Sequence, residues 1–230
     1  MGWEQFARNS WTTLAGADPV GAEAVIGINL AFVPATILID SFEDGLNQTA
    51  PPDIEIEVPS AIGGFRLLAQ IAGENQITVT APEGLPGFLF TGSRDVGGTT
   101  KAEWNGDGGL GGIDLTAGGD RFQLSGVVFL DTASALETLT LRVTDTVDGV
   151  STFTETYENI CNTSPNCVFG ETSPVGTYEI PFSSLSGGAN LASVDIIALE
   201  FFTEPFVSNV AIEIGSFQVV PEPSTGLLLG

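Results

Sequence analysis

The chain has 230 residues, 43% of them hydrophobic, and carries six Lys and Arg against 29 Asp and Glu, which gives a formal net charge of -23 at pH 7. This charge repels nucleic acid and anionic membrane surfaces, and it effectively excludes nucleic-acid functions. The chain has no histidine, which excludes Ser-His-Asp and Cys-His catalysis and imidazole-dependent zinc or iron sites, and any metal is expected to be a hard cation held by oxygen.

The first 35 residues do not match the rest of the chain. An apolar run leads into Val33, Pro34 and Ala35, small residues of the kind that precede a signal-peptide cleavage point. The segment before it is acidic, whereas a signal peptide begins with positive charge. Residues 1–35 are therefore interpreted as a leader or signal-like segment, or as a mis-assigned start; the alternative is a short surface helix over residues 3–14.

From Thr36 onward the sequence predicts a succession of short β-strands. The segments are rich in β-branched and aromatic residues, many alternate apolar with polar side chains, and Gly, Pro and Asn clusters separate them. The predicted strands cover residues 36–42, 54–58, 65–71, 76–80, 88–90, 122–130, 138–144, 151–157, 177–182, 194–202 and 210–219. Asp148-Gly149 predicts a hairpin turn, and Gly215 predicts a bulge where the alternation of the last segment slips.

This pattern predicts the fold class. About ten short strands without alternating helices favour an all-β fold, an antiparallel two-sheet sandwich of jelly-roll type, with little helix outside the leader. A chain of this length buries a full core in one domain of the usual size for such sandwiches. The predicted organisation is a leader over residues 1–35, a β-sandwich over 36–220 and a terminal motif over 221–230.

Residues 105–120, NGDGGLGGIDLTAGGD, form the most glycine-rich stretch of the chain. They match the G-x-G-x-x-G spacing of dinucleotide-binding sites, but no strand-helix-strand context surrounds them. They also approximate one calcium-binding β-helix repeat, a motif that needs several stacked copies. The favoured interpretation is a loop between sheet edges, in which glycines allow positive φ.

Two side-chain groups stand out within the predicted domain. Cys161 and Cys167 flank a short polar loop and are predicted to form a local disulfide, with two free thiols as the alternative.

Trp104 precedes the polar residues Asn105 and Asp107, and these three are a candidate glycan-binding site. An indole covers the apolar face of a sugar while neighbouring amides and carboxylates bond to its hydroxyls. The alternative is that Trp104 packs in the core.

The C-terminal residues carry a recognisable motif. Pro221, Glu222, Pro223, Ser224 and Thr225 follow the last predicted strand, and the prolines end the sheet because they cannot donate to it. The motif and the apolar residues after it resemble the PEP-CTERM sorting signal of exopolysaccharide-associated bacterial proteins. The resemblance implies recognition by an exosortase and only transient membrane contact through the tag, whose apolar segment is truncated here. The alternative is a Pro-rich linker.

Four further stretches resemble recurrent extracellular domains of PEP-CTERM proteins, which in turn look like carbohydrate-binding jelly rolls. The stretches are LIDSFEDG, IGGFR, AEWNGDGGLGGIDLTAGGDRFQL and SVDIIALEF. The resemblance implies export to the bacterial cell envelope or extracellular matrix and a glycan-binding or structural role.

The same resemblance implies a structural calcium ion between the first and last strands. The corresponding acids here are Asp40, Glu43, Asp44 and Glu213. Calcium takes six to eight oxygen ligands, so main-chain carbonyls and water would complete the set. The alternative is that these acids are exposed on edge strands.

The expected function is that of an exported, non-catalytic protein whose β-sandwich binds or organises extracellular polysaccharide. The alternative is a glycan-active hydrolase or lyase that uses paired carboxylates. Glycoside hydrolysis needs two opposed carboxylates, and Glu155 with Glu158, or Glu55 with Glu57, are nominated for it. Acids that alternate along strands are equally typical of a solvated sheet face, so the sequence specifies no acid-base pair.

Overall fold

A computed structural model describes residues 35–44, 47–51, 53–80, 87–93, 97–130, 136–168, 171–204 and 210–222. The chain divides into two units, Met1–Phe32 and Val33–Gly230, and all described residues belong to the second. The predicted leader over residues 1–35 therefore lies outside the described residues, apart from its last position. Within the described part of the chain, no helix is long and apolar enough to cross a membrane.

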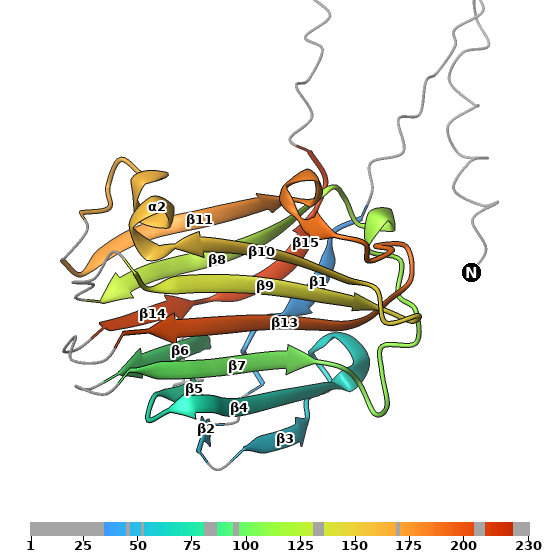
Figure 1. Ribbon diagram of the computed structural model, residues 1–230, viewed down its shortest axis with the longest axis horizontal. Coiled ribbons are helices and arrows are strands. Elements are labelled where there is room, and N and C mark those ends of the chain that lie inside the picture. Colours follow the sequence, from blue (N-terminus) through green and yellow to red (C-terminus); the bar gives the residue numbers. More distant parts are fainter. Residues whose placement is uncertain are drawn as a thin grey trace, which may run out of the picture. The chain divides into compact units, whose positions relative to one another are not determined.

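The described residues form two antiparallel β-sheets with very little helix, which confirms the predicted all-β sandwich of jelly-roll type (Figure 1). The eight-stranded sheet contains β1 (Ile37–Asp40), β2 (Gln48–Ala50), β5 (Gln76–Thr80), β6 (Phe88–Ser93), β8 (Arg121–Leu130), β11 (Ser173–Pro181), β14 (Val210–Ile214) and β15 (Ser216–Val220). The seven-stranded sheet contains β3 (Ile54–Glu57), β4 (Phe65–Gly73), β7 (Gly98–Trp104), β9 (Thr138–Asp145), β10 (Val150–Thr156), β12 (Ser186–Gly187) and β13 (Val194–Thr203).

Strand order shows how distant segments meet. The seven-stranded sheet runs β12-β10-β9-β13-β7-β4-β3, so β13 lies between β9 and β7, and Figure 1 views this sheet from its outer side. The eight-stranded sheet runs β1-β15-β8-β14-β6-β5-β2, and β11 also pairs with β8. Strands β14 and β15 continue each other across Gly215, whose amide donates to the Ser125 carbonyl at 2.8 Å. The bulge predicted at Gly215 is thus a break between two strands.

The core fills the space between the two sheets. Inward-facing side chains alternate with outward-facing ones along the central strands, as half-buried strands require. From the seven-stranded sheet the buried residues include Ala102, Trp104, Leu139, Leu141, Val143, Ile197, Leu199 and Phe201, and from the eight-stranded sheet they include Phe122, Leu124, Phe129, Phe217 and Val219. The ring centroids of Trp104 and Phe217 lie 5.4 Å apart, so aromatic contacts join the sheets.

The turns between strands follow the residues that the sequence places there. Asp148 has φ of 63° and its amide donates to the Asp145 carbonyl at 3.1 Å, which confirms the predicted hairpin between β9 and β10. The Asp145 carboxylate accepts bonds from the amides of Asn190, Val147 and Gly149, which hold its pKa below the ordinary value. Asp145 therefore ties the hairpin to the segment that precedes β13.

Helical structure in the described residues is limited to four short elements. These are η1 (Ile62–Gly64), η2 (Leu115–Ala117), α2 (Tyr157–Asn162) and η3 (Phe182–Ser184). The Thr156 side chain accepts a hydrogen bond from the Asn159 amide at 3.2 Å and caps α2, so the segment predicted as a strand to residue 157 ends one residue earlier. The glycine-rich stretch 105–120 forms a loop with η2 inside it, and Gly109 has φ of 110°, which agrees with the favoured interpretation.

Candidate functional site

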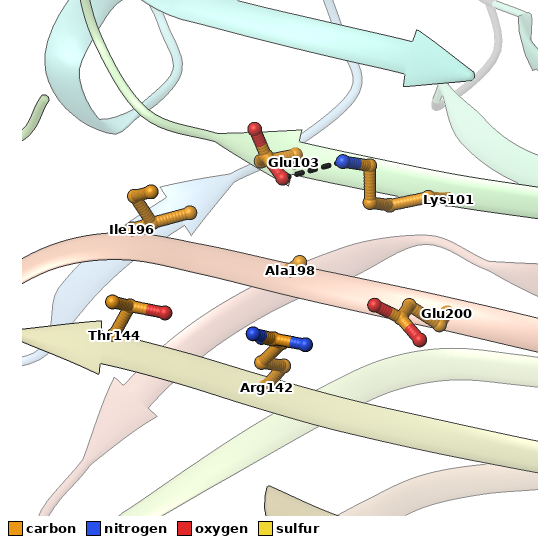
Figure 2. Close-up of a pocket in the computed structure, with 7 residues that line it drawn as sticks. All are labelled: Lys101, Glu103, Arg142, Thr144, Ile196, Ala198 and Glu200. Atoms are coloured by element: carbon orange, nitrogen blue, oxygen red, sulfur yellow. Dashed lines mark hydrogen bonds and ion pairs between the residues drawn. The ribbon is translucent and has the colours of Figure 1, made fainter. Parts of the chain in front are cut away.

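A hollow lies on the outer face of the seven-stranded sheet, over its three central strands (Figure 2). Its volume is ≈ 360 Å³, within the range of small-molecule sites, which is about 300–1,000 Å³. It is lined by Lys101 and Glu103 from β7, Arg142 and Thr144 from β9, and Ile196, Ala198 and Glu200 from β13. These seven residues define what we call the outer-face hollow.

Strand alternation explains why these side chains point away from the core. On β9 the buried Leu141 and Val143 alternate with Arg142 and Thr144, and β7 and β13 follow the same rule around their buried residues. The outward positions of β7 and β9 are polar, whereas those of β13 include Ile196, Ala198 and Phe202 beside Glu200. The inward residues, most of them apolar, hold the sheet on its core. The core packing therefore fixes which residues line the outer-face hollow.

Strand register places Ala198 at its centre. Ala198 on β13 is paired with Glu103 on β7 and with Arg142 on β9, so a methyl group separates two long charged side chains. Only 1% of Ala198 is exposed although it lies on the outer face, because its neighbours extend over it. A small residue between large ones creates the depression, and Figure 2 shows Ala198 between β7 and β9 in this arrangement.

One side of the outer-face hollow is held in place by an ion pair. Lys101 Nζ lies 2.7 Å from Glu103 Oε2, and Asn105 Nδ2 donates to Glu103 Oε1 at 3.2 Å. Both carboxylate oxygens of Glu103 thus have protein partners. These bonds restrict the side chain, and a restricted polar side chain loses less entropy when a ligand binds beside it.

The opposite side is less constrained. The Arg142 side chain is exposed, and none of the described carboxylates lies within 4 Å of its guanidinium. Glu200 is paired in register with Lys101 and with Thr140, which puts it diagonally across from Arg142. The outer-face hollow therefore combines two cations and two carboxylates, and Arg142 has all five N–H donors available to a ligand.

An apolar side chain lies beside the outer-face hollow on the same strand. Phe202 follows Glu200 by two residues on β13, so it points to the same face, and 38% of it is exposed. Its register partners are Thr99 and Thr138, both small polar residues. The face thus offers a flat ring within one strand repeat of the charged groups.

Sequence reasoning missed the residues of the outer-face hollow. Two signals in the sequence mark them in retrospect. Lys101 and Arg142 are two of only six cations in a chain with 29 acids. Arg142 also falls in the polar phase of the predicted strand 138–144.

The structure corrects the prediction that Trp104 presents a platform to sugar. Trp104 is 0% exposed and packs against Phe42 and Phe217, and its Nε1 donates to Asp40 Oδ2 at 2.9 Å. It shares the inward phase of β7 with Ala102, so the alternation of the strand directs the indole into the core. The ring therefore has no free face on which a sugar could stack.

The other two residues of that candidate site, Asn105 and Asp107, have different surroundings. Asn105 contacts the outer-face hollow through its bond to Glu103, at the end of β7. Asp107 is exposed in the glycine-rich loop. The carbonyl oxygen of the Asn105 side chain is buried without a hydrogen-bond partner. Of the three predicted glycan-binding residues, only Asn105 borders the hollow.

The four acids predicted to hold calcium do not gather at one site in the fold. Asp40 and Asp44 accept ion pairs from the buried Arg66, at 2.8 Å and 2.5 Å. Glu43 is exposed, and Glu213 alternates with buried Ile212 and Ile214, so it faces outward from the eight-stranded sheet.

Arg66 supplies Asp40 and Asp44 with the positive charge that they were expected to receive from a metal. Asp40 Oδ1 also accepts from the Phe42 amide at 2.8 Å, so both of its oxygens have partners. Within the described ranges no three Asp, Glu or Cys side chains gather in a metal-binding arrangement. Calcium binding at Asp40, Glu43, Asp44 and Glu213 stays a prediction that these contacts do not support.

Another buried acid, Glu137, lies away from the outer-face hollow. Glu137 precedes β9 and is 0% exposed, and neither carboxylate oxygen has a hydrogen-bond partner. Burial and the negative charge of Glu204 raise the pKa of Glu137 to about 8. Burial and Glu137 also raise the pKa of Tyr157, whose hydroxyl is buried without a partner. Glu137 is therefore protonated at neutral pH, and it makes folding sensitive to pH.

Cys161 and Cys167 form the predicted disulfide, with Cα atoms 5.3 Å apart. The bond links α2 to the loop that follows it.

Of the predicted sorting motif, Pro221 and Glu222 are described, and Glu222 Oε1 lies 3.5 Å from Arg121 Nη2. Pro223, Ser224 and Thr225 lie outside the described residues, so the motif stays a prediction.

No protein-family model matches the chain, and no curated protein matches it. Among solved structures, a family 11 carbohydrate-binding module of Clostridium thermocellum, in complex with a β-1,3-1,4-mixed-linked tetrasaccharide, is 11% identical with a TM-score of 0.40. That match covers 81% of this chain and 95% of the module.

A second likeness is to an exo-β-agarase, at 12% identity and a TM-score of 0.41, covering 82% of this chain and 25% of the agarase. A third is to the carbohydrate-binding and catalytic modules of a xylanase from Clostridium thermocellum, at 14% identity and a TM-score of 0.33, covering 84% of this chain and 29% of that one. All three TM-scores lie below 0.5, so these likenesses assign this chain neither a family nor a ligand.

Proposed function

We propose that the protein binds an extracellular polysaccharide through the outer-face hollow and performs no catalytic step on it. The observation that carries the proposal is the arrangement around Ala198, in which a small floor is bordered by both cations and carboxylates. Sugar hydroxyls donate and accept hydrogen bonds at once, so a site for them needs both kinds of group. Lys101 and Arg142 donate, whereas Glu200 accepts.

The surroundings of the outer-face hollow also suit a glycan. Sugar rings have apolar C–H faces that pack on aromatic rings, and the exposed Phe202 lies two residues from Glu200 on the same face. Thr99 and Thr138 are the register partners of Phe202, and Thr140 is a register partner of Glu200. The hydroxyls of these threonines offer further hydrogen bonds. An extended chain of sugars can therefore follow the sheet beyond the hollow.

The carboxylates first nominated for hydrolysis have other surroundings. Glu55 and Glu57 are exposed on the edge strand β3. Glu155 Oε1 accepts bonds from the Thr156 amide and from Asn159 Nδ2 at the start of α2. Neither nominated pair lies in the outer-face hollow.

We place this function outside the cytoplasm. A disulfide between Cys161 and Cys167 suits an oxidising compartment. The PEP-CTERM-like residues 221–225 suit export followed by recognition by an exosortase and retention at the bacterial envelope. The acidic surface suits a protein that stays soluble among polysaccharides.

Replacing Ala198 with leucine tests the proposed site. A larger side chain on this floor fills the outer-face hollow but removes no charged group. We expect Ala198→Leu to weaken retention on the recognised polysaccharide by about tenfold or more, because the sugar loses its contact surface. Affinity electrophoresis in gels that contain a panel of polysaccharides measures this, with released reducing ends assayed in parallel.

The matched control is Thr177→Leu, which adds a similar side chain at an exposed position of β11 in the other sheet. This variant should keep wild-type retention, and thermal unfolding should show both variants folded. Equal retention of wild type and Ala198→Leu would reject the outer-face hollow as the site. Release of reducing ends by wild type would instead identify a hydrolase.

A further inference from the structure

Arg142 is the one cation within the described ranges that has no carboxylate partner. Arg66 is paired with Asp40 and Asp44, Lys101 is paired with Glu103, and Arg121 is paired with Asp120, Glu179 and Glu222. The whole chain has 29 acids for six cations, so carboxylates are abundant. A guanidinium left unpaired in so acidic a protein has a donor set that no intramolecular contact uses.

The neighbours of Arg142 do not neutralise it. Glu103 already contacts Lys101 and Asn105, and its strand is separated from β9 by β13. Glu200 is in register with Lys101 rather than with Arg142. In Figure 2 the Arg142 guanidinium and the Glu200 carboxylate both rise from the sheet, and no dashed line joins them. Arg142 therefore presents its positive charge to whatever enters the outer-face hollow.

The chemistry of a guanidinium indicates what that ligand carries. Its planar fork of N–H donors matches the two oxygens of a carboxylate, and such charge-assisted pairs are stronger than bonds to neutral hydroxyls. Threonine, asparagine or glutamine would suffice for hydroxyls alone. A guanidinium at this position therefore gains most from a negatively charged ligand.

We infer that the glycan bound in the outer-face hollow is acidic and that Arg142 binds the carboxylate of one of its sugars, a uronic acid. This inference rests on the proposed function and names its ligand class. Glu200 and Glu103 line the same hollow and accept bonds from hydroxyls of the same or an adjacent sugar. The two glutamates also repel a second carboxylate, so the site suits one acidic sugar at a time.

The net charge of the protein gives this inference a distinctive salt dependence. At a net charge of -23 the protein repels an acidic polysaccharide at long range when salt is low. Screening shortens that repulsion from roughly 30 Å at 0.01 M salt to about 8 Å at 0.15 M, while the contact at Arg142 persists. Near 1 M salt the contact weakens as well. Affinity for an acidic chain is therefore expected to pass through a maximum at intermediate salt.

The experiment compares acidic polysaccharides with neutral counterparts of the same backbone. Alginate, polygalacturonate and glucuronan are each used intact and after chemical reduction of their carboxylates to alcohols. Binding of the whole protein is measured by affinity electrophoresis and calorimetry at three salt concentrations. The variants are Arg142→Gln and Arg142→Lys, and Arg121→Gln is the control that removes the same charge from the other sheet.

At least one intact polyuronate is expected to bind about tenfold or more tightly than its reduced form. Arg142→Gln should remove that preference, Arg142→Lys should restore part of it, and Arg121→Gln should leave it unchanged. Equal binding of intact and reduced chains would overturn the acidic-ligand inference while polysaccharide binding stands. Binding of no member of any pair, neutral or acidic, would overturn the proposed function together with the inference.

Discussion

Replacing Arg66 with methionine is expected to lower the free energy of unfolding by about 3–5 kcal/mol. Arg66 is 0% exposed and forms ion pairs with Asp40 and Asp44. Arg66 Nε also donates a hydrogen bond to Gln48 Oε1 at 3.3 Å. Methionine preserves most of the side-chain volume but removes the charge. Asp40 would then keep only its bonds from Trp104 and the Phe42 amide, and two carboxylates would stay buried without their cation.

Chemical denaturation of wild type, Arg66→Met and Arg121→Met measures this effect. Arg121 also contacts three acids, but Asp120 and Glu222 are exposed, and surface ion pairs contribute about 0–1 kcal/mol. Arg121→Met is therefore a control with the same change of residue and charge. If Arg66→Met were as stable as this control, the buried ion pairs would not hold β1 and β4 together as argued.

Replacing Glu137 with glutamine is expected to change how stability depends on pH. The pKa of Glu137 is raised from 4.5 to about 8 in the folded protein, so between these values the unfolded chain has released a proton that the native state keeps. Stability then falls as pH rises through this window, by at most about 1.4 kcal/mol per pH unit. Glutamine has no proton to release, so Glu137→Gln should lose this contribution to the slope.

Denaturation of both proteins from pH 5 to about pH 10 tests this prediction. The variant should gain stability relative to wild type as pH rises, and the gain should level off above about pH 8, where native Glu137 ionises. Glu171→Gln is the control, because Glu171 is an exposed acid between α2 and β11. Parallel pH profiles for wild type and Glu137→Gln would contradict the assignment of Glu137 as a buried, protonated acid.

Local sequence patterns predicted most strands because alternation and turn residues act over a few positions. Strand β5 has the predicted bounds, and β9 and β8 differ from prediction by one residue at one end. Strand β7, GTTKAEW, was missed because Gly, Lys, Ala and Glu are depleted in strands. Pairing with β4 on one side and β13 on the other stabilises β7 despite this composition.

The candidate site was harder to predict because it depends on strand register. Lys101, Arg142 and Glu200 are far apart in sequence and meet only because β13 pairs with β7 and β9 at particular residues. No local pattern specifies that register. The scarcity of cations in the chain was the available signal, and it identifies residues without saying which of them lie together.

Trp104 shows how a correct local observation can lead to a wrong site. The residue does abut a polar loop, as the sequence indicated, but its side chain belongs to the inward phase of a strand that had not been predicted. For the acids predicted to bind calcium, the missing information was a partner on another strand. Nothing near Asp40 in the sequence indicates that Arg66, on another strand, supplies its counter-charge.

Methyl NMR of the protein during titration with a bound polysaccharide fragment tests the proposed binding face most directly. Ala198 and Ile196 carry methyl groups in the outer-face hollow, whereas Ala102 on the neighbouring strand faces the core and is buried. The account predicts that the Ala198 and Ile196 signals shift in a saturable way while the Ala102 signal stays in place. Saturable shifts confined to methyl groups of the eight-stranded sheet, with Ala198 and Ile196 unchanged, would contradict it.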